Sequence, residues 1–188
     1  MTKTESPRTQ TPFLRGEQIN LREITTRDVD GNYITWINDQ EITQYLETGF
    51  FPTSVESGVE YVEQMVGNDD VLFLAIVDTE SGDHIGNIKL GPINWIHRRA
   101  EIGILIGETE FWGRGIGTEA IRLITAHAFE RLNLHKLTAG CHEENVGSKK
   151  AFKNVGFTEE GRRMKHAYYD GKYTDVIELG LLRAGFEA

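Results

Sequence analysis

The stretch EFWGRGIGTEA, residues 110–120, places Gly113, Gly115 and Gly117 directly before a helix-like run that begins at Thr118. Because glycine weakens regular structure, three glycines here need a reason. The first turn of a helix carries unpaired N–H groups and the positive end of the helix dipole. Glycines allow that backbone to approach a phosphate closely. The stretch therefore predicts either a phosphate-binding turn or a tight turn between a strand and a helix.

Strand patterns precede the glycine stretch. The segment RAEIGILIG, residues 99–107, is apolar toward its end and leads directly into the glycines. Two earlier runs, VLFLAIVD (71–78) and HIGNIKLG (84–91), flank the turn TESGD and are typical of a hairpin. The segment QINLREI (18–24) alternates apolar and polar residues and predicts a first strand. The glycine stretch thus follows a strand and opens a helix.

Helical patterns occur four times along the chain. Apolar residues recur at roughly helical spacing in DVDGNYITWIND, residues 28–39. A second helix is predicted after the capping-box pattern of Thr53 and Glu56. An amphipathic helix starts at Thr118, and a short helix ends with Gly156.

The last part of the chain returns to strands. HKLTAGC (135–141) predicts one strand, and residues 162–182 predict two strands around Asp170-Gly171, a strong hairpin signal. The order is strand, two helices, three strands, helix, strand, helix and two strands. We therefore expect one mixed α/β domain with a central sheet of about seven strands and about four flanking helices.

Composition restricts the class of protein. A chain of 188 residues with 39% hydrophobic residues is long enough for one domain with its own core. We expect residues 1–12, which are polar, to form a disordered arm and residues 13–188 to form the domain. One cysteine and no apolar membrane segment favour a cytoplasmic protein. The net charge of −9 argues against nucleic acid as partner; it suits a cationic small molecule or aids solubility.

Three segments together resemble a known family. EFWGRGIGTEAIRLI, preceded by HRRAEIGILIG and followed by ENVGSKKAFKNVGF, is similar to the GCN5-related N-acetyltransferases (GNAT). The likeness is greatest to the branch of ribosomal-protein and spermidine N-acetyltransferases, and it covers nearly all of residues 14–182. Gly115 and Gly117 fill the glycine positions of the family loop, and Trp112 stands where the family has Arg or Gln. The resemblance implies a twisted, mixed and mostly antiparallel sheet.

The resemblance also implies acetyl-CoA as cosubstrate. The amides of Arg114, Gly115, Ile116, Gly117 and Thr118 would hold its pyrophosphate. The strand end formed by Ile104, Leu105 and Ile106 would pair with its pantetheine arm, while the side chains of these residues belong to the core. A backbone N–H there could stabilise the developing oxyanion.

Acetyl transfer to an amine needs a proton acceptor, because an amine with a pKa of about 10 is mostly charged at neutral pH. Glu101 is the candidate base, since a carboxylate in the apolar segment AEIGILI needs an explanation. The alternative is an ion pair with Arg98 or Arg99. Ser148 is the candidate proton donor to the leaving thiolate; the alternatives are Tyr168, Tyr169 and departure of the thiolate without a donor. The family often carries a tyrosine four residues after that serine, and here the residue is Phe152.

Asn145 and Ser148 match the N-x-x-S pattern of the family. The resemblance implies that Asn145 binds the pantetheine arm and that Ser148 lies near the sulfur. Both residue types are also good helix caps, which is the alternative. Cys141 is interpreted as a core residue and not as a nucleophile. The six histidines show no metal spacing, so no metal is expected.

The acceptor amine is the least determined part. The segment NYITWINDQEITQYLE, residues 32–47, resembles acetyltransferases of nucleotide-linked amino sugars, whereas the C-terminal hairpin resembles spermidine acetyltransferases. Trp36 and Tyr45 could stack on a substrate, although Trp36 could equally pack in the core. A protein N-terminus and a non-catalytic CoA-binding module are the alternatives. Edge strands of the hairpin could pair two subunits into a homodimer.

Overall fold

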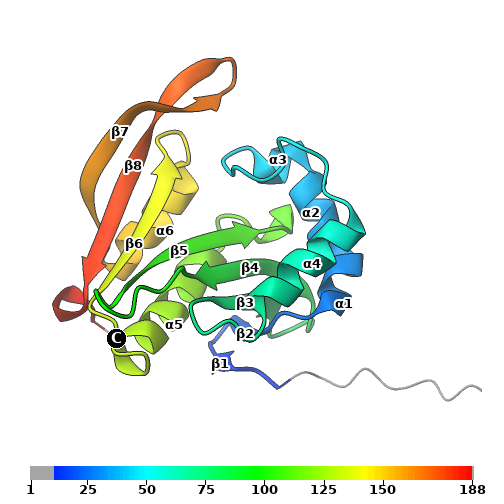
Figure 1. Ribbon diagram of the computed structural model, residues 1–188, viewed down its shortest axis with the longest axis horizontal. Helices are drawn as coiled ribbons and strands as arrows, with labels where there is room; N and C mark the ends of the chain where they lie inside the picture. Colours follow the sequence, from blue (N-terminus) through cyan, green and yellow to red (C-terminus); the bar gives the residue numbers. More distant parts are fainter. Residues whose placement is uncertain (1–10, 188) are drawn as a thin grey trace, which may run out of the picture.

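A single sheet of eight strands organises the computed structural model, which describes residues 11–187 (Figure 1). The strand order is β1-β2-β3-β4-β5-β6-β8-β7, and every neighbouring pair is antiparallel except β5 and β6. Most of the expected arm, residues 1–12, lies outside the described residues. The strands are β1 (Leu14–Arg15), β2 (Ile19–Glu23), β3 (Leu72–Asp78), β4 (His84–Leu90), β5 (Arg99–Ile106), β6 (Lys136–His142), β7 (Thr158–Tyr169) and β8 (Lys172–Leu182).

Helices cover both faces of the sheet (Figure 1). Two helices, α5 and α6, cover one face, and the N-terminal helices cover the other face over β3 and β4. The helices are α1 (Thr26–Asp28), the π-helical turn η1 (Val29–Tyr33), α2 (Ile34–Asn38), α3 (Gln40–Thr43), α4 (Val55–Met65), α5 (Ile116–Glu130) and α6 (Val146–Val155), with short 3-10 turns η2 (Thr109–Phe111) and η3 (Arg183–Gly185). The mixed α/β fold expected from the sequence is confirmed.

Local signals identified most of these elements. Both hairpins form, and Asp170 and Gly171 take the left-handed backbone of a tight turn (φ 48° and 77°). Gly156 ends α6 with φ 111°. The helix expected to open with Thr53 instead has Ser54 as its cap, whose hydroxyl accepts from the N–H of Ser57.

Two expectations need correction. The two residues of β1 were not predicted as a strand, so the sheet has eight strands and not seven. The helix expected over residues 28–39 is broken into short pieces around Gly31, whose φ of −93° and ψ of −132° are not helical. Without a side chain, glycine adopts this backbone easily, and the helical spacing of its neighbours hides the break.

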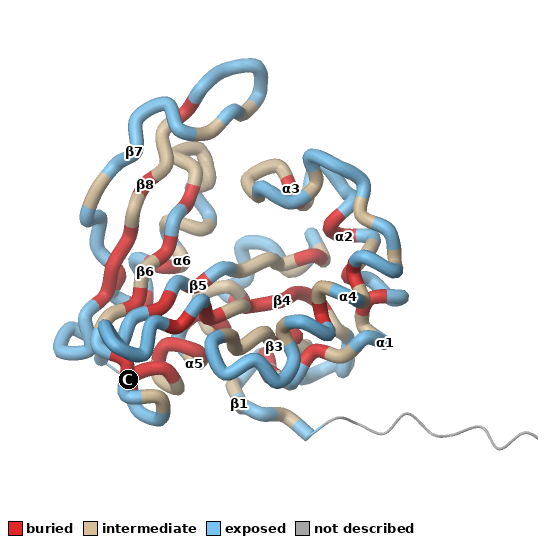
Figure 2. Tube along the Cα trace, in the orientation of Figure 1, coloured by how far each residue is buried: buried red, intermediate tan, exposed pale blue. Residues whose placement is uncertain are grey.

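The core follows the two faces of the sheet (Figure 2). The larger buried cluster joins the strands to α5 and α6, with Ile121, Ile124 and Phe152 among its buried members. A smaller buried cluster, which includes Trp36, packs the N-terminal helices against Phe73 and Leu105. Among residues 11–187, no helix is both long and apolar enough to cross a bilayer.

The parallel pair β5–β6 is short. Its register runs only from Arg99 opposite Lys136 to Glu101 opposite Thr138. Beyond that point β5 stays paired with β4, whereas β6 stays paired with β8, and the two strands diverge in Figure 1. The sheet therefore opens in its middle, where β5 and β6 separate.

Gly107, directly after β5, is required by packing. A Cβ built on Gly107 would overlap the buried ring of Trp36, which is 2% exposed. A Cβ on Gly103, four residues earlier, would meet no heavy atom within 4 Å. The two positions thus form a matched pair on one stretch of backbone.

We expect Gly107→Ala to lower the free energy of unfolding by about 1–3 kcal/mol, because Trp36 must move in a packed core. Gly103→Ala should change it little. Urea unfolding followed by tryptophan fluorescence measures both values. Equal effects of the two substitutions would contradict the packing role of Gly107.

Candidate functional site

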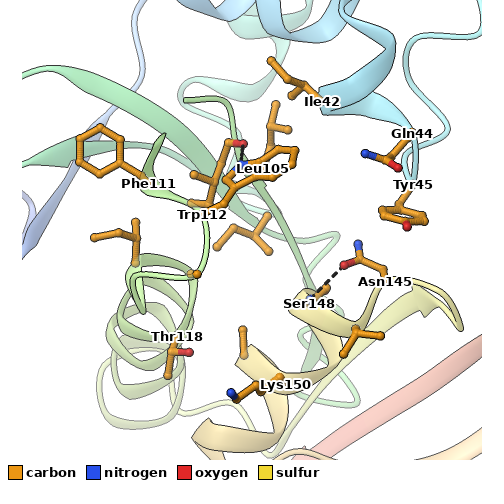
Figure 3. A pocket seen from close by; sticks show the side chains of 18 of the residues that line it. Ile42, Gln44, Tyr45, Leu105, Phe111, Trp112, Thr118, Asn145, Ser148 and Lys150 are labelled. Atoms are coloured by element: carbon orange, nitrogen blue, oxygen red, sulfur yellow. Dashed lines mark hydrogen bonds between the residues drawn. The ribbon is translucent and has the colours of Figure 1, made fainter. Parts of the chain in front are cut away.

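A groove of about 660 Å³ opens where β5 and β6 separate. Figure 3 shows side chains from β5, the loop before α5, the start of α6 and the segment after α3 around this space. Of the residues predicted to bind acetyl-CoA, all but Arg114 line it. The lining residues are 41, 42, 44–46, 104–106, 111–113, 115–118, 144–148, 150, 151 and 154.

The end of β5 leaves backbone groups free on the groove side. The C=O of Glu101 accepts from the N–H of Gly91 on the β4 side, at 2.8 Å. Since backbone groups alternate along a strand, the N–H and C=O groups of Ile104 and Ile106 turn the other way, toward the groove. The indole N–H of Trp112 donates to the C=O of Ile106 at 2.9 Å. An extended, amide-containing ligand could pair with the remaining groups as an added strand.

The glycines shape the turn into α5. Gly113 (φ 74°) and Gly115 (φ 90°) have the left-handed backbone that glycine adopts at least cost, and Gly115 is the residue before the helix. A Cβ on Gly117 would project between Ile104 and Ala151, at 3.8 and 3.9 Å from their side chains. Glycine therefore keeps the space in front of the free N–H groups of the helix open, which fits a pyrophosphate.

The basic side chains near the groove have different partners. The guanidinium of Arg114 lies 5.0 Å from the centre of the Phe111 ring, so its charge stacks on an aromatic face. Arg114 itself does not line the groove. The Nζ of Lys149 donates to the C=O of Glu143 at 2.5 Å, whereas Lys150 lines the groove.

Asn145 and Ser148 combine the two roles that the sequence left open. The side-chain oxygen of Asn145 accepts from the N–H of Ser148 at 3.0 Å and caps α6 (Figure 3). Both residues also line the groove. The cap thereby fixes the backbone of Ser148 in the first turn of α6.

Two residues near the site are unsuited to proton or acyl transfer. Phe152 is 2% exposed and packs on Phe157 with ring centres 5.0 Å apart, so its position offers no hydroxyl. Cys141 is buried, and burial raises the pKa of its thiol to about 11. A thiol with this pKa is a poor nucleophile at neutral pH, which confirms Cys141 as a core residue.

Glu101 lies where β5 and β6 begin to part. Its Oε1 is 4.0 Å from a Cβ built on Gly140 of β6, and the residue is exposed. In the described part of the chain it forms no ion pair, neither with Arg98 nor with Arg99. It does not line the groove, but it shares a face of β5 with Gly103.

Tyr45, which lines the groove, belongs to an aromatic cluster that joins the segment after α3 to β6 and β7. Its hydroxyl donates to that of Tyr169 at 3.1 Å, and Tyr169 donates to the side-chain oxygen of Gln44, also at 3.1 Å. The ring of His142 packs edge-on against Tyr45 at 5.7 Å. Burial and the Tyr169 hydrogen bond raise the pKa of Tyr45 to about 12. Tyr45 is therefore a neutral side chain at the groove.

Trp36 does not reach the site. It is 2% exposed, and its indole N–H donates to Glu108 at 3.1 Å. The expectation that Trp36 stacks on a substrate is therefore wrong, because its ring is packed against Gly107.

Among residues 11–187, no group of three or more His, Cys, Asp or Glu side chains could hold a metal ion.

A second cavity of about 670 Å³ adjoins the groove. The two share Leu46, Ile104 and Leu105, so they meet at the end of β5. Sequence reasoning missed two of its members, Tyr61 of α4 and Lys89 of β4. The strand pattern puts Lys89 on one face of β4, but only the packing of α4 shows that this face borders a cavity.

Comparisons with known proteins agree with this geometry. Residues 18–158 match the model of the acetyltransferase (GNAT) domain. The spermidine N(1)-acetyltransferase of Escherichia coli K12 is 35% identical over 162 residues, which are 86% of this chain and 84% of that protein. A putative ribosomal N-acetyltransferase of Bacillus subtilis is 28% identical over 177 residues, 91% of this chain and 94% of that protein.

A solved structure gives the same result. The spermidine N-acetyltransferase of Vibrio cholerae, in complex with CoA and spermine, superposes with a TM-score of 0.81 and 26% identity. The match covers 90% of this chain and 98% of that one. The resemblance found in the glycine stretch is thereby confirmed, and the chain belongs to the GNAT family of N-acetyltransferases.

Proposed function

We propose that the protein transfers the acetyl group of acetyl-CoA to a primary amine of a small molecule, by direct attack within a ternary complex. The observation that carries this proposal is the meeting of two cavities at Ile104 and Leu105. One cavity has the backbone and helix start that suit CoA, and the other is free for an acceptor. The CoA bound in the structure of the Vibrio cholerae relative supports the first assignment.

Acetyl-CoA would supply the thioester that makes the acetyl group reactive. The residues of this chain bind and orient it. The N–H groups from Arg114 to Thr118 face the pyrophosphate, and those of Ile104 and Ile106 pair with the amide-rich arm. A backbone N–H at the end of β5 donates to the acyl oxygen, where negative charge develops.

Proton transfer is assigned to two side chains. Glu101 accepts the proton of the acceptor amine, directly or through a water molecule, from its position at the start of the strand separation. Ser148, on the first turn of α6, donates a proton toward the thiolate. The pKa of about 11 at Cys141 speaks against a route through an acetylated cysteine.

The acceptor is proposed to be an amino sugar or a polyamine, with Tyr45 at the boundary between groove and acceptor. Spermine in the relative's structure supports an amine of this size. The N-terminus of a protein is the second candidate, favoured by the likeness to a putative ribosomal N-acetyltransferase. A CoA-binding module without catalysis is the third, because Phe152 provides no proton donor.

We expect Gly117→Glu to weaken acetyl-CoA binding at least about 100-fold, since a carboxylate would stand in front of the proposed phosphate site. Isothermal titration calorimetry gives the affinity. Gly185→Glu is the matched control, because Gly185 is exposed, a Cβ there makes only an ordinary contact with Leu181 at 3.7 Å, and it lies outside the groove. If a folded Gly117→Glu protein bound acetyl-CoA with unchanged affinity, the turn before α5 would not be the phosphate-binding site.

We expect Glu101→Gln to lower kcat/KM about 100-fold at neutral pH and less at high pH, where the amine loses its proton unaided. Steady-state rates with the best amine of a panel measure the pH profile. The acetyl-CoA affinity should stay unchanged, since Glu101 does not line the groove. Glu63→Gln on α4 is the control; a deficit independent of pH would assign Glu101 a structural role instead.

A further inference from the structure

Lys89 brings a positive charge to the proposed acceptor cavity. It lies on β4 opposite Phe73 and Gly103, and it lines the cavity together with Tyr61. Its Nζ donates to the Tyr61 hydroxyl at 3.1 Å and lies 5.8 Å from the centre of that ring. The side chain is thus held in place and half-buried, not extended into solvent.

The ammonium group of Lys89 has no counter-ion within the part of the chain that the structure describes. Among residues 11–187, Lys89 forms no ion pair with a carboxylate. An ammonium has three N–H donors, and the one hydrogen bond that it makes within the described residues goes to Tyr61. Because partial burial of an unpaired charge costs free energy, a bound anion here would be stabilised. The Tyr61 hydroxyl, which accepts from Lys89, keeps its own proton for the same anion.

The surroundings of Lys89 leave room for a ligand. Gly103 lies beside it on β5, and a Cβ at Gly103 would meet nothing within 4 Å. Glu101 follows on the same face of β5, two residues away from the position opposite Lys89. The only other charged side chain lining the cavity within the described residues is Glu47. The cavity therefore offers a cationic group and, near it, carboxylates that suit an amine.

We propose that the acceptor is an amine that also carries an acid group, a carboxylate or a phosphate, and that Lys89 and Tyr61 bind this acid group. The inference rests on the proposed function and narrows it. A polyamine has only positive charges, and the ammonium of Lys89 would repel it from the cavity. The preference therefore differs from that named for the Escherichia coli relative, a spermidine N(1)-acetyltransferase.

The test compares amines that differ only in the acid group. Glucosamine 6-phosphate is paired with glucosamine, and L-methionine with L-methioninamide; spermidine is the polycation. In calorimetry on the CoA-loaded protein, the acid-bearing member of one pair should bind at least tenfold more tightly than its partner without the acid group. Spermidine should bind more weakly than that acid-bearing amine. The pair that responds distinguishes phosphate from carboxylate. Acetylation rates with acetyl-CoA should follow the same order.

Two variants connect the preference to the residue. Lys89→Gln should reduce the ratio within the responding pair to near one, and Lys89→Glu should shift the preference to spermidine. Lys153→Gln, an exposed lysine on α6, is the matched control and should keep the ratio of the wild type. Acetyl-CoA affinity should be the same in all four proteins, because Lys89 does not line the groove.

The outcomes separate the two proposals. Equal binding within both pairs, or tighter binding of spermidine by the wild type, overturns the role of Lys89 while acetyl-CoA binding leaves the proposed function intact. If the affinity ratio within the responding pair is unchanged in Lys89→Gln, the role of Lys89 is also overturned. Absence of acetyl-CoA binding overturns the proposed function instead. The same titrations without CoA then still decide whether Lys89 selects acid-bearing amines.

Discussion

The candidate site depends on the short pairing between β5 and β6. β5 and β6 share a parallel register over three residue pairs, ending at Glu101 and Thr138, and then separate. Each strand keeps its outer neighbour, so the sheet stays continuous while its middle opens. The register with β4 turns the N–H and C=O groups of Ile104 toward the opening, and the starts of α5 and α6 both border it. In the proposed function, the cosubstrate takes up the hydrogen-bonding capacity that a regular sheet would use internally.

The two cavities differ in the kind of contact they offer. The groove presents backbone N–H groups and a helix start, which suit phosphate and amide groups, and Lys150 is the one basic side chain among its described lining residues. The second cavity presents side chains of opposite sign, Glu47 and Lys89, over an open floor at Gly103. Under the proposed function, cosubstrate recognition therefore rests mainly on backbone geometry, whereas acceptor choice rests on a few side chains that can change without altering the fold.

The sequence predicted what is encoded locally. The glycine loop, the hairpin at Asp170-Gly171 and the end of α6 at Gly156 follow from turn and cap chemistry, and the structure has all three. It failed where distant segments decide. The ring of Trp36 is buried because Gly107 leaves room for it, 71 positions later. Lys89 borders a cavity because α4 packs across its strand, which no pattern within β4 reveals.

The position of β8 has a consequence for synthesis of the chain. β8 lies between β6 and β7 in the sheet. It is the strand that pairs with β6 on the side opposite β5. The hairpin that it completes also carries Tyr169 to the segment after α3, 124 residues earlier in the chain. A nascent chain on the ribosome therefore cannot close one side of the opening until its last strand has emerged, although β2 to β5 can already pair.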